Sequence, residues 1–330
     1  MGKKHIDAKK LILPIIIVLA VTVLLTIAFL GLKFWEEQQG DFPSQETESV
    51  TMEQNGTVYV PKESIETFLV LGLDKYEGGS ASDSYNNDKQ ADFIMLFVFD
   101  NAAKRCSAIH INRDTMAMMN ILGVAGNKVA TVRKQIALSH TYGNGRDVSC
   151  RNTADAVSEL LLGVKVNHYV SLTMDSVATM NDLVGGVEVT VLDDFTGIDD
   201  ALVKGETVTL TGEQALHYVR TRYGLEDSSN STRMARQQQY IRALHEKIVA
   251  KTEADEEFIV DASLKMADYM ISDRSVTQLQ ELARKFEEYE FAPVYDIEGE
   301  SQMGEEFIEF YPNADSVKQI VIDLFYQRKK

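Results

Sequence analysis

The sequence predicts an α/β fold, in which helices and strands alternate along the chain and pack as layers. Short apolar runs bounded by polar turns occupy residues 67–73, 93–99 and 107–111, and such runs are typical of buried strands. Further along, longer segments with helical spacing of apolar residues alternate with short strand-like runs. Strands mixed with helices in this order favour an α/β sandwich.

The elements after residue 150 follow from local signals. Asn152 is a residue type that caps helices, and Gly185 with Gly186 marks a turn between a helix and a strand. The segment after residue 253 carries no visible chemistry and is expected to pack on the same domain. Helices are predicted over residues 152–161, 174–184 and 314–326, and strands over residues 168–172, 187–191 and 291–297.

Two further helices are predicted in a part of the sequence that contains several arginines. Thr211 and Gln214 have the spacing of a capping box, which predicts a helix that begins there and ends near residue 219. Beyond that end the chain can be extended, and residues two apart in extended chain share a face. We therefore expect Arg220 and Arg222 to point into one pocket.

The next helix is predicted over residues 231–249. Arg233 and Gln237, four residues apart, share a face of this helix beside its apolar stripe. The stripe has helical spacing and consists of Met234, Ile241, Leu244 and Ile248.

The charge of the chain excludes one large class of partners. Its 330 residues carry a net charge of −17, whereas binding to a nucleic-acid backbone needs a basic surface. We therefore expect no nucleic-acid partner. Any anion site in this protein must be a local basic cluster.

The N-terminus predicts a membrane anchor. Residues 11–32 contain no charged side chain, a length that can cross a bilayer as a helix, and four lysines precede this run. The positive-inside rule then keeps the N-terminus in the cytoplasm and places the rest outside the cell membrane. A cleaved signal peptide is the alternative. The predicted organisation is a cytoplasmic tail (1–10), a single-pass transmembrane anchor (11–35), a stalk (36–63) and an extracellular domain (64–330).

The two cysteines, Cys106 and Cys150, leave two alternatives open. An exported protein often joins such a pair in a disulfide. Two buried free thiols are the other interpretation. The sequence shows no metal-ligand spacing around either residue.

Polar residues gather at the ends of the first predicted strands. Asp74 follows one strand, Asp92 precedes the next, and "NRDT" (residues 112–115) follows the third. Sites in α/β domains tend to form beyond strand ends. Between the two aspartates, residues 75–89 form a loop rich in glycine and serine, which is either disordered or a lid.

These segments resemble the LytR-CpsA-Psr (LCP) family of bacterial cell-wall glycopolymer ligases. The family signatures LG-x-D, R-x-D, PRDT, Y-x-R-x-R and R-x-x-RQ correspond to "LGLD", "QAD", "NRDT", "YVRTR" and "RMARQ", in that order. The resemblance covers residues 65–248 and leaves residues 249–330 as a C-terminal extension. It implies an α/β/α sandwich with a central mixed sheet.

The resemblance also implies an activity. Members transfer a phosphate-linked glycan, such as teichoic acid or capsule polysaccharide, from a polyprenyl-pyrophosphate carrier to peptidoglycan in the envelope. The expected enzyme is a Mg²⁺-dependent phosphotransferase, with Mn²⁺ as an alternative ion. Guanidinium groups suit the paired oxygens of a pyrophosphate, and Mg²⁺ prefers carboxylate and phosphate oxygens.

Carried over to this sequence, the family pattern assigns each site residue. Asp74 and Asp92 would hold the metal ion. Catalytic roles fall on Arg113, Asp114, Arg220 and Arg222, and substrate binding on Arg113, Arg220, Arg222, Arg233, Arg236 and Gln237. Asp114 and Arg236 have a second interpretation, in which they brace a strand end and a helix through salt bridges.

One position departs from the family pattern. Gln90 stands where R-x-D has its arginine, so one expected positive charge is missing. This departure keeps open a non-catalytic protein that binds polyprenyl-linked glycans. A lipid-carrier pyrophosphatase would use the same residues with water as the acceptor. A membrane-bound transcription attenuator is disfavoured, because about ten cytoplasmic residues leave no room for a DNA-reading fold.

Overall fold

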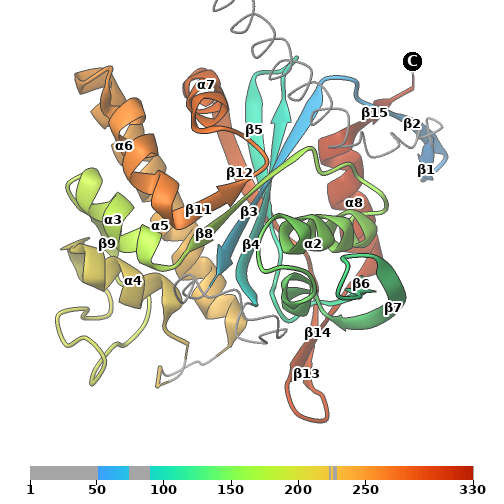
Figure 1. Cartoon of the computed structure of the whole chain (residues 1–330), viewed down its shortest axis with the longest axis horizontal. Helices are drawn as coiled ribbons and strands as arrows, with labels where there is room; N and C mark the ends of the chain where they lie inside the picture. Colours follow the sequence, from blue (N-terminus) through green and yellow to red (C-terminus); the bar gives the residue numbers. More distant parts are fainter. Residues whose placement is uncertain (1–50, 74–89, 223, 226–228, 330) are drawn as a thin grey trace, which may run out of the picture. The chain divides into compact units, whose positions relative to one another are not determined.

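A six-stranded mixed sheet forms the centre of the structure, a computed structural model that describes residues 51–73, 90–222, 224–225 and 229–329. The strand order is β11-β8-β3-β4-β5-β12 (Figure 1). Strand β3 pairs parallel with β8, and β5 pairs parallel with β12, whereas the other neighbours are antiparallel. The strands are β3 (Ile65–Leu73), β4 (Ala91–Asp100), β5 (Arg105–His110), β8 (His168–Thr173), β11 (Met270–Ser272) and β12 (Glu290–Asp296).

Helices cover both faces of this sheet. Alternate residues of a strand point to opposite faces, so Leu69 and Leu71 of β3 pack in one core and Phe68 packs in another. Helices α2 (Asp147–Leu160) and α8 (Ala314–Phe325) cover the first face, and α5 (Asn230–Ala254), α6 (Phe258–Met266) and α7 (Val276–Glu287) lie on the second (Figure 1). The predicted layering of helices on a mixed sheet is confirmed.

A separate apolar cluster supports the arginine-bearing segments. It joins α5 to α3 (Asp175–Leu183), α4 (Gly212–Arg220) and the hairpin of β9 (Val187–Thr190) and β10 (Thr207–Leu210). Tyr218 of α4 and Phe195 stack in this cluster with ring centroids 5.7 Å apart. The cluster fixes the end of α4 against α5.

Two hairpins and two short 3₁₀ helices were among the elements that were not predicted. Strand β7 (Lys128–Gln135) is largely exposed and shows no apolar alternation, so it gives little strand signal. It pairs with β6 (Met116–Leu122), and β13 (Gly299–Met303) pairs with β14 (Ile308–Pro312). The 3₁₀ helices are η1 (Ile136–Thr141) and η2 (Ala267–Tyr269).

The folded unit begins earlier than the sequence predicted. It starts at Thr51, whereas the sequence predicts a start near residue 64. Strands β1 (Met52–Gln54) and β2 (Thr57–Pro61) form a hairpin, and β2 also pairs with β15 (Tyr326–Arg328) near the other end of the chain. The signal was missed because both strands are short and their third partner is distant in sequence.

The N-terminal predictions lie mostly outside the described residues. The tail, the anchor and residues 36–50 of the stalk belong to this part. Among the helices that the structure does describe, none combines the length and the apolar character that a membrane span requires.

Helix α2 begins at Asp147, before the predicted cap at Asn152. The Asn144 side-chain oxygen accepts hydrogen bonds from the backbone nitrogens of Arg146 and Val148 instead. Asn152 lies inside the helix, and its side chain donates to the backbone oxygens of Asn120 and Ser139 at 3.0 and 2.7 Å. Asn152 therefore ties the helix to its neighbours rather than starting it.

The two cysteines are free and buried. Cys106 packs in the core under α7, and Cys150, which belongs to α2, packs in the core on the other side, so they lie on opposite faces of the sheet. Burial raises the pKa of the Cys106 thiol to about 12 and that of the Cys150 thiol to about 11. The alternative of two buried thiols is the one that the structure contains.

Candidate functional site

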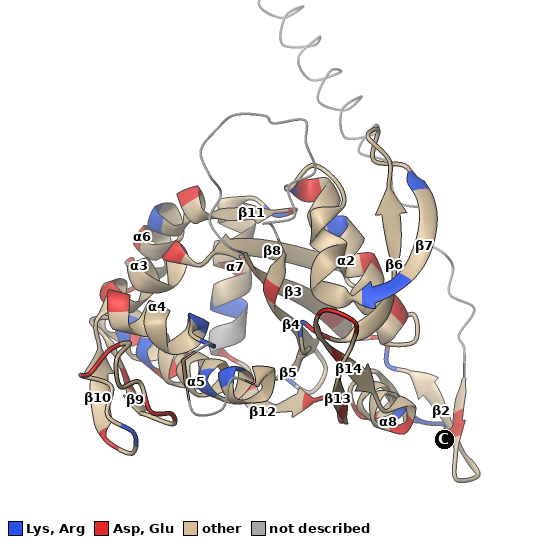
Figure 2. Cartoon of the chain, turned by 90° about the horizontal axis from the view of Figure 1, so that it is seen from below, with Lys and Arg blue, Asp and Glu red and all other residues tan. Residues whose placement is uncertain are grey.

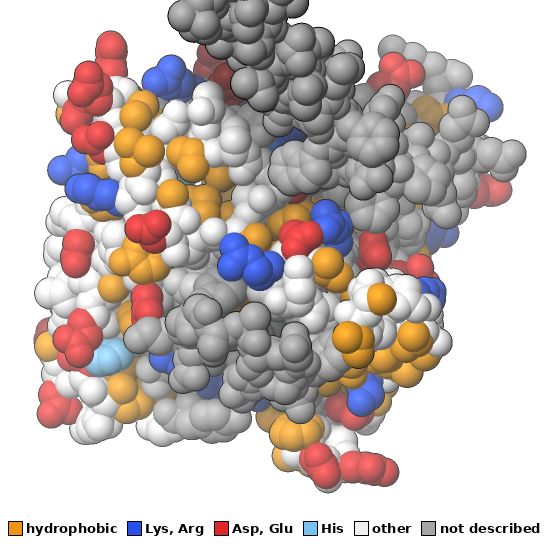
Figure 3. All heavy atoms as spheres, viewed as in Figure 1, with side chains coloured by type: hydrophobic (Ala, Val, Ile, Leu, Met, Phe, Trp, Pro, Cys, Tyr) orange, Lys and Arg blue, Asp and Glu red, His pale blue; other side chains and the backbone are white. Residues whose placement is uncertain are grey.

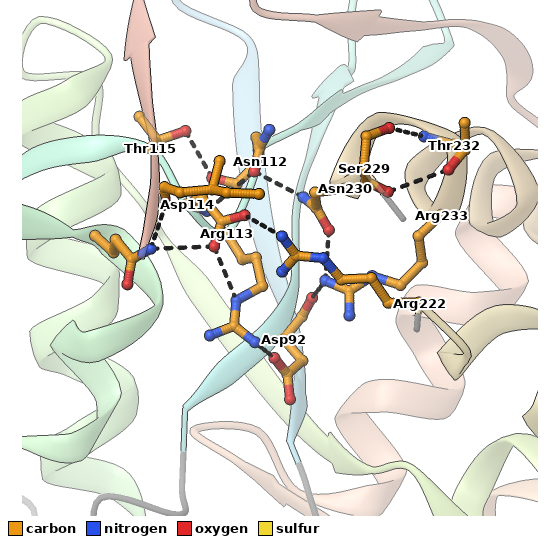
Figure 4. A network of polar contacts seen from close by, with 12 residues as sticks. Asp92, Asn112, Arg113, Asp114, Thr115, Arg222, Ser229, Asn230, Thr232 and Arg233 are labelled. Atoms are coloured by element: carbon orange, nitrogen blue, oxygen red, sulfur yellow. Dashed lines mark hydrogen bonds and ion pairs between the residues drawn. The ribbon is translucent and has the colours of Figure 1, made fainter. Parts of the chain in front are cut away.

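A polar network lies where three strands of the sheet reach the same end. Strand β3 ends there at Leu73, β5 ends at His110, and the antiparallel strand β4 begins there at Ala91. The β3–β4 pairing shifts register between Gly72 and Leu73, at this same end. Figure 4 shows side chains from β4, the segment after β5, the segment after α4 and helix α5 pointing toward one another.

Arg113 contacts three side chains of the network. Its Nη1 donates to the Asp92 carboxylate, and its Nη2 donates to the side-chain oxygen of Gln90. Its Nε lies 3.4 Å from an oxygen of Asp114. Hydrogen bonds to two acceptors therefore hold the guanidinium plane, whereas Nε makes no hydrogen bond.

Asp114 is a buried counterion between two arginines. Its side chain is 4% exposed, and its second carboxylate oxygen lies 3.5 Å from Nη2 of Arg222. The Gln135 side chain donates to it at 3.3 Å. These contacts agree with the interpretation of Asp114 as a brace.

Arg233 completes the cluster from helix α5. Its Nη2 donates to the Asn230 side-chain oxygen at 2.5 Å and lies 3.4 Å from the backbone oxygen of Asp92. Burial lowers the pKa of Arg233 to about 10, and the positive charges of Arg113 and Arg222 contribute to the decrease. Arg233 nevertheless remains charged at neutral pH.

Among the described residues, the network therefore holds three guanidinium groups against two carboxylates. The three cations are Arg113, Arg222 and Arg233, and the carboxylates are Asp92 and Asp114. The excess of one positive charge stands out because acidic side chains are spread over many of the surrounding elements (Figure 2). Partly buried charges interact strongly, so this cluster favours an anion with several oxygens.

Sequence reasoning missed two asparagines of this network. The Asn230 side chain donates to the Asn112 side-chain oxygen at 2.7 Å, and that oxygen also accepts from the backbone nitrogen of Asp114. Asn230 precedes Arg233 by three residues in a helix, a spacing that brings side chains together. From that spacing, the contact between Asn230 and Arg233 could have been predicted.

Helix α4 ends as its capping pattern predicted. The Thr211 and Gln214 side chains each accept a hydrogen bond from the other's backbone nitrogen. The helix ends at Arg220, and Thr221 has an extended backbone. Arg220 is exposed at this end, whereas the Arg222 side chain is only 12% exposed and faces Asp114. The two arginines thus have different surroundings.

Arg236 and Gln237 hold the end of α4 from helix α5. Arg236 donates to the backbone oxygens of Tyr218 and Thr221, and Gln237 donates to that of Val219. Carbonyls in the last turn of a helix lack partners within the helix, so these side chains satisfy them.

Arg236, which the family pattern assigns to substrate binding, is enclosed by protein groups. Its side chain has no exposed surface, its Nε lies 2.8 Å from an Asp193 oxygen, and its guanidinium stacks over Phe195. These contacts agree with the second interpretation of Arg236, in which it braces the segment that carries Arg222.

The predicted metal site is only partly within the described residues. Asp74 lies outside them. Asp92 is described, but its carboxylate accepts a hydrogen bond from Arg113. Within the described part of the chain, no three His, Cys, Asp or Glu side chains are grouped closely enough to hold a metal ion. A single carboxylate is of the right type for Mg²⁺, which takes most of its other ligands from phosphate and water.

An apolar cavity of about 290 Å³ lies next to the end of α4, between the sheet and helix α5. Its wall includes Val219 and Gln237, which link it to the arginine-bearing segments. On the face shown in Figure 3, hydrophobic side chains are scattered among polar and charged ones. Further lining residues include Val70, Phe93, Leu172, Ile241, Leu244 and Ile248.

The fold is that of a mixed α/β protein with a cluster of partly enclosed arginines at the ends of its central strands. The chain belongs to the LytR_cpsA_psr family, whose model matches residues 35–321.

Two relatives of this chain are named as cell-wall proteins. It is 26% identical over 244 residues to the polyisoprenyl-teichoic acid–peptidoglycan teichoic acid transferase TagU of Enterococcus faecalis, which covers 73% of this chain and 72% of that protein. It is 27% identical over 258 residues to the cell wall biosynthesis protein LcpA of Corynebacterium glutamicum, which covers 69% of this chain but 47% of that protein.

Solved structures share the fold. Protein gbs0355 from Streptococcus agalactiae superposes with a TM-score of 0.62 at 19% identity, covering 79% of this chain and 86% of that one. TagT bound to LIIa-WTA superposes with a TM-score of 0.60 at 21% identity, covering 79% and 90%.

Proposed function

We propose that this protein transfers a phosphate-linked glycopolymer from a polyprenyl-pyrophosphate carrier to peptidoglycan. The observation that carries the proposal is the convergence of Arg113, Arg222 and Arg233 beside an apolar cavity. A carrier lipid presents this combination of charge and hydrophobic chain. The name of the E. faecalis relative supports the same reaction.

The reaction needs little covalent chemistry from the protein. An acceptor hydroxyl forms a bond to the glycan-bearing phosphorus and gives up its proton, while the bridging P–O bond breaks and polyprenyl monophosphate leaves. Phosphoryl transfer depends mainly on positioning and on neutralising charge. Arg113, Arg222 and Arg233 are arranged to contact the phosphate oxygens in this step. Arg220, exposed at the end of α4, remains a second candidate for that contact.

The proposal includes a metal ion. Asp92, with Asp74, would hold Mg²⁺, or Mn²⁺ in its place, and the ion would neutralise charge on the pyrophosphate. In the structure described, Asp92 instead holds Arg113. Asp92 therefore has two roles in the proposal, as the partner of an arginine and as a metal ligand.

The proposed location follows from the N-terminal sequence. A single-pass anchor with its N-terminus in the cytoplasm would place the folded unit outside the cell membrane, where peptidoglycan is found. The carrier lipid would reach the cavity from the same membrane.

A product assay tests the proposal. The purified full chain is given a polyprenyl-pyrophosphate glycan, peptidoglycan and Mg²⁺, and mass spectrometry follows the glycan. We expect a phosphodiester between glycan and peptidoglycan, together with polyprenyl monophosphate. Glycan phosphate released into solution would instead identify a pyrophosphatase, and bound but unchanged substrate would identify a binding protein.

Matched arginine variants control the assay. Arg222→Ala removes a cation of the network, whereas Arg105→Ala removes one whose side chain is 52% exposed at the start of β5. We expect only the first to lose transfer. Equal transfer by both variants would remove the arginine cluster from the mechanism.

A further inference from the structure

Gln90 contacts the arginine cluster directly. Its side-chain oxygen accepts a hydrogen bond from Nη2 of Arg113, while Asp92 accepts one from Nη1. Gln90 and Asp92 are two residues apart at the start of β4, and residues two apart in extended chain point to the same side. The chain therefore presents one neutral and one charged acceptor to the same guanidinium.

This contact gives a reason for the departure from the family's R-x-D pattern. A guanidinium has only donors, so an arginine at position 90 has no acceptor to offer Arg113. It would also place two like charges together in a partly buried site. Glutamine reverses both effects, because its oxygen accepts from Arg113 and it brings no charge.

The second acceptor changes how firmly Arg113 is held. One carboxylate contact leaves the guanidinium able to turn about it, whereas two acceptors on different nitrogens fix the plane. Nε of Arg113 lies 3.4 Å from Asp114 but makes no hydrogen bond, so Gln90 and Asp92 are the two acceptors that set the plane. A cation fixed before its ligand arrives loses less conformational freedom on binding, which increases affinity.

We propose that Gln90 is a positioning residue that orients Arg113 toward the pyrophosphate. This inference rests on the proposed function, in which Arg113 contacts the phosphate oxygens. Gln90 thus contributes to the site through Arg113. The change at position 90 therefore does more than remove one positive charge. Asp92 alone would hold Arg113 less firmly.

A double-mutant cycle tests the proposal in the full chain. Binding of inorganic pyrophosphate with Mg²⁺ is measured by calorimetry for the parent, Gln90→Leu, Arg113→Ala and the double variant. Gln90→Leu keeps much of the side-chain size but removes the acceptor, and we expect affinity to fall about five- to tenfold. In the Arg113→Ala background the same change should have no further effect, because Gln90 acts through Arg113.

Three further variants sharpen the test. Gln90→Glu keeps an acceptor and should bind more tightly than Gln90→Leu, despite its negative charge. Gln90→Arg should bind no better than the parent, despite its positive charge. Gln319→Leu, on the exposed side of α8, is the control and should leave binding unchanged.

The outcomes separate this inference from the proposed function. Parental affinity in Gln90→Leu, additive losses in the cycle, or a gain in Gln90→Arg would each overturn the positioning role alone. Absence of pyrophosphate binding by the parent would overturn the proposed function and this inference with it. Thermal unfolding of each variant distinguishes a lost contact from a lost fold.

Discussion

Nε of Arg236 lies 2.8 Å from a carboxylate oxygen of Asp193, in a pair where the arginine has no exposed side-chain surface. The same guanidinium donates to two backbone oxygens at the end of α4. One buried cation thus joins helix α5, the segment after β9 and the end of α4. The position of Arg222 depends on this junction.

Arg236→Ala should therefore reduce stability strongly. Removing one partner of a buried ion pair costs about 3 to 5 kcal/mol, because the other charge stays buried without compensation. The free energy of unfolding, measured by urea denaturation, should fall by about this amount. Arg242→Ala, on the exposed side of α5, is the matched control. Parental stability with lost ligand binding would return Arg236 to the list of substrate contacts.

Two shortened chains test where the folded unit begins, because they should differ in stability. A chain that begins at Thr51 keeps strands β1 and β2, whereas one that begins at Ser64 leaves β15 without its partner. The shorter form also loses Lys62, which lies 3.3 Å from an Asp100 oxygen and donates to the backbone oxygen of Leu324.

We expect the chain from Ser64 to have a lower thermal midpoint and to aggregate more, because an unpaired strand edge binds other chains. Light scattering and thermal unfolding measure both effects. Identical midpoints for the two forms would show that β1 and β2 contribute nothing to the fold.

His110 should make the protein sensitive to acid. Burial lowers the pKa of this side chain to about 3, from an ordinary value of 6.5, with a smaller contribution from the charge of Arg233. Between these values the unfolded chain binds a proton that the folded chain does not, so stability falls as pH falls. At pH 5 the loss is about 2 kcal/mol.

His110→Asn should weaken this pH dependence while leaving an uncharged side chain beside Gln238. Urea denaturation of both proteins at pH 5 and pH 8 provides the measurement. The difference in unfolding free energy between the two pH values should be smaller in the variant. An equal difference in both proteins would assign the acid sensitivity to other groups.

Filling the apolar cavity should separate lipid binding from phosphate binding. Leu244→Trp places a larger side chain on the cavity wall, at a cost of about 1 to 3 kcal/mol in stability. We expect a polyprenyl phosphate to bind at least about tenfold more weakly, while inorganic pyrophosphate binds as before.

Leu264→Trp is the matched control, because this leucine on α6 is 60% exposed. Lipid binding should be unchanged in this variant. Unaltered lipid affinity in Leu244→Trp would remove the cavity from the proposed carrier site.

The sequence predicted the local features of the site better than its long-range contacts. The start of α4 was predictable because Thr211 and Gln214 contact each other within one turn. The partners of Arg236 were not, since Asp193 and Thr221 come from separate segments and no spacing connects them. The β1–β2 hairpin was missed because its strands have only 3 and 5 residues, and its further partner β15 comes from the other end of the chain.

The spacing of Arg220 and Arg222 illustrates this limit. Extended chain after α4 was predicted and is present at Thr221, yet the two side chains differ in exposure. Arg222 faces Asp114 in the network, and Arg220 lies at the exposed end of the helix. Only the packing of α4 against α5 decides which of the two is enclosed.

Alanine substitution should therefore affect the two arginines unequally. A charge-assisted contact contributes about 1.5 to 3 kcal/mol, so Arg222→Ala should weaken pyrophosphate binding roughly ten- to hundredfold. Arg222→Lys should fall between this variant and the parent, because lysine keeps the charge but lacks the planar fork. Arg220→Ala should have a smaller effect, since solvated charges contribute little. Calorimetry with inorganic pyrophosphate and Mg²⁺ measures all three, and a larger loss in Arg220→Ala than in Arg222→Ala would reverse the assignment of the phosphate contact.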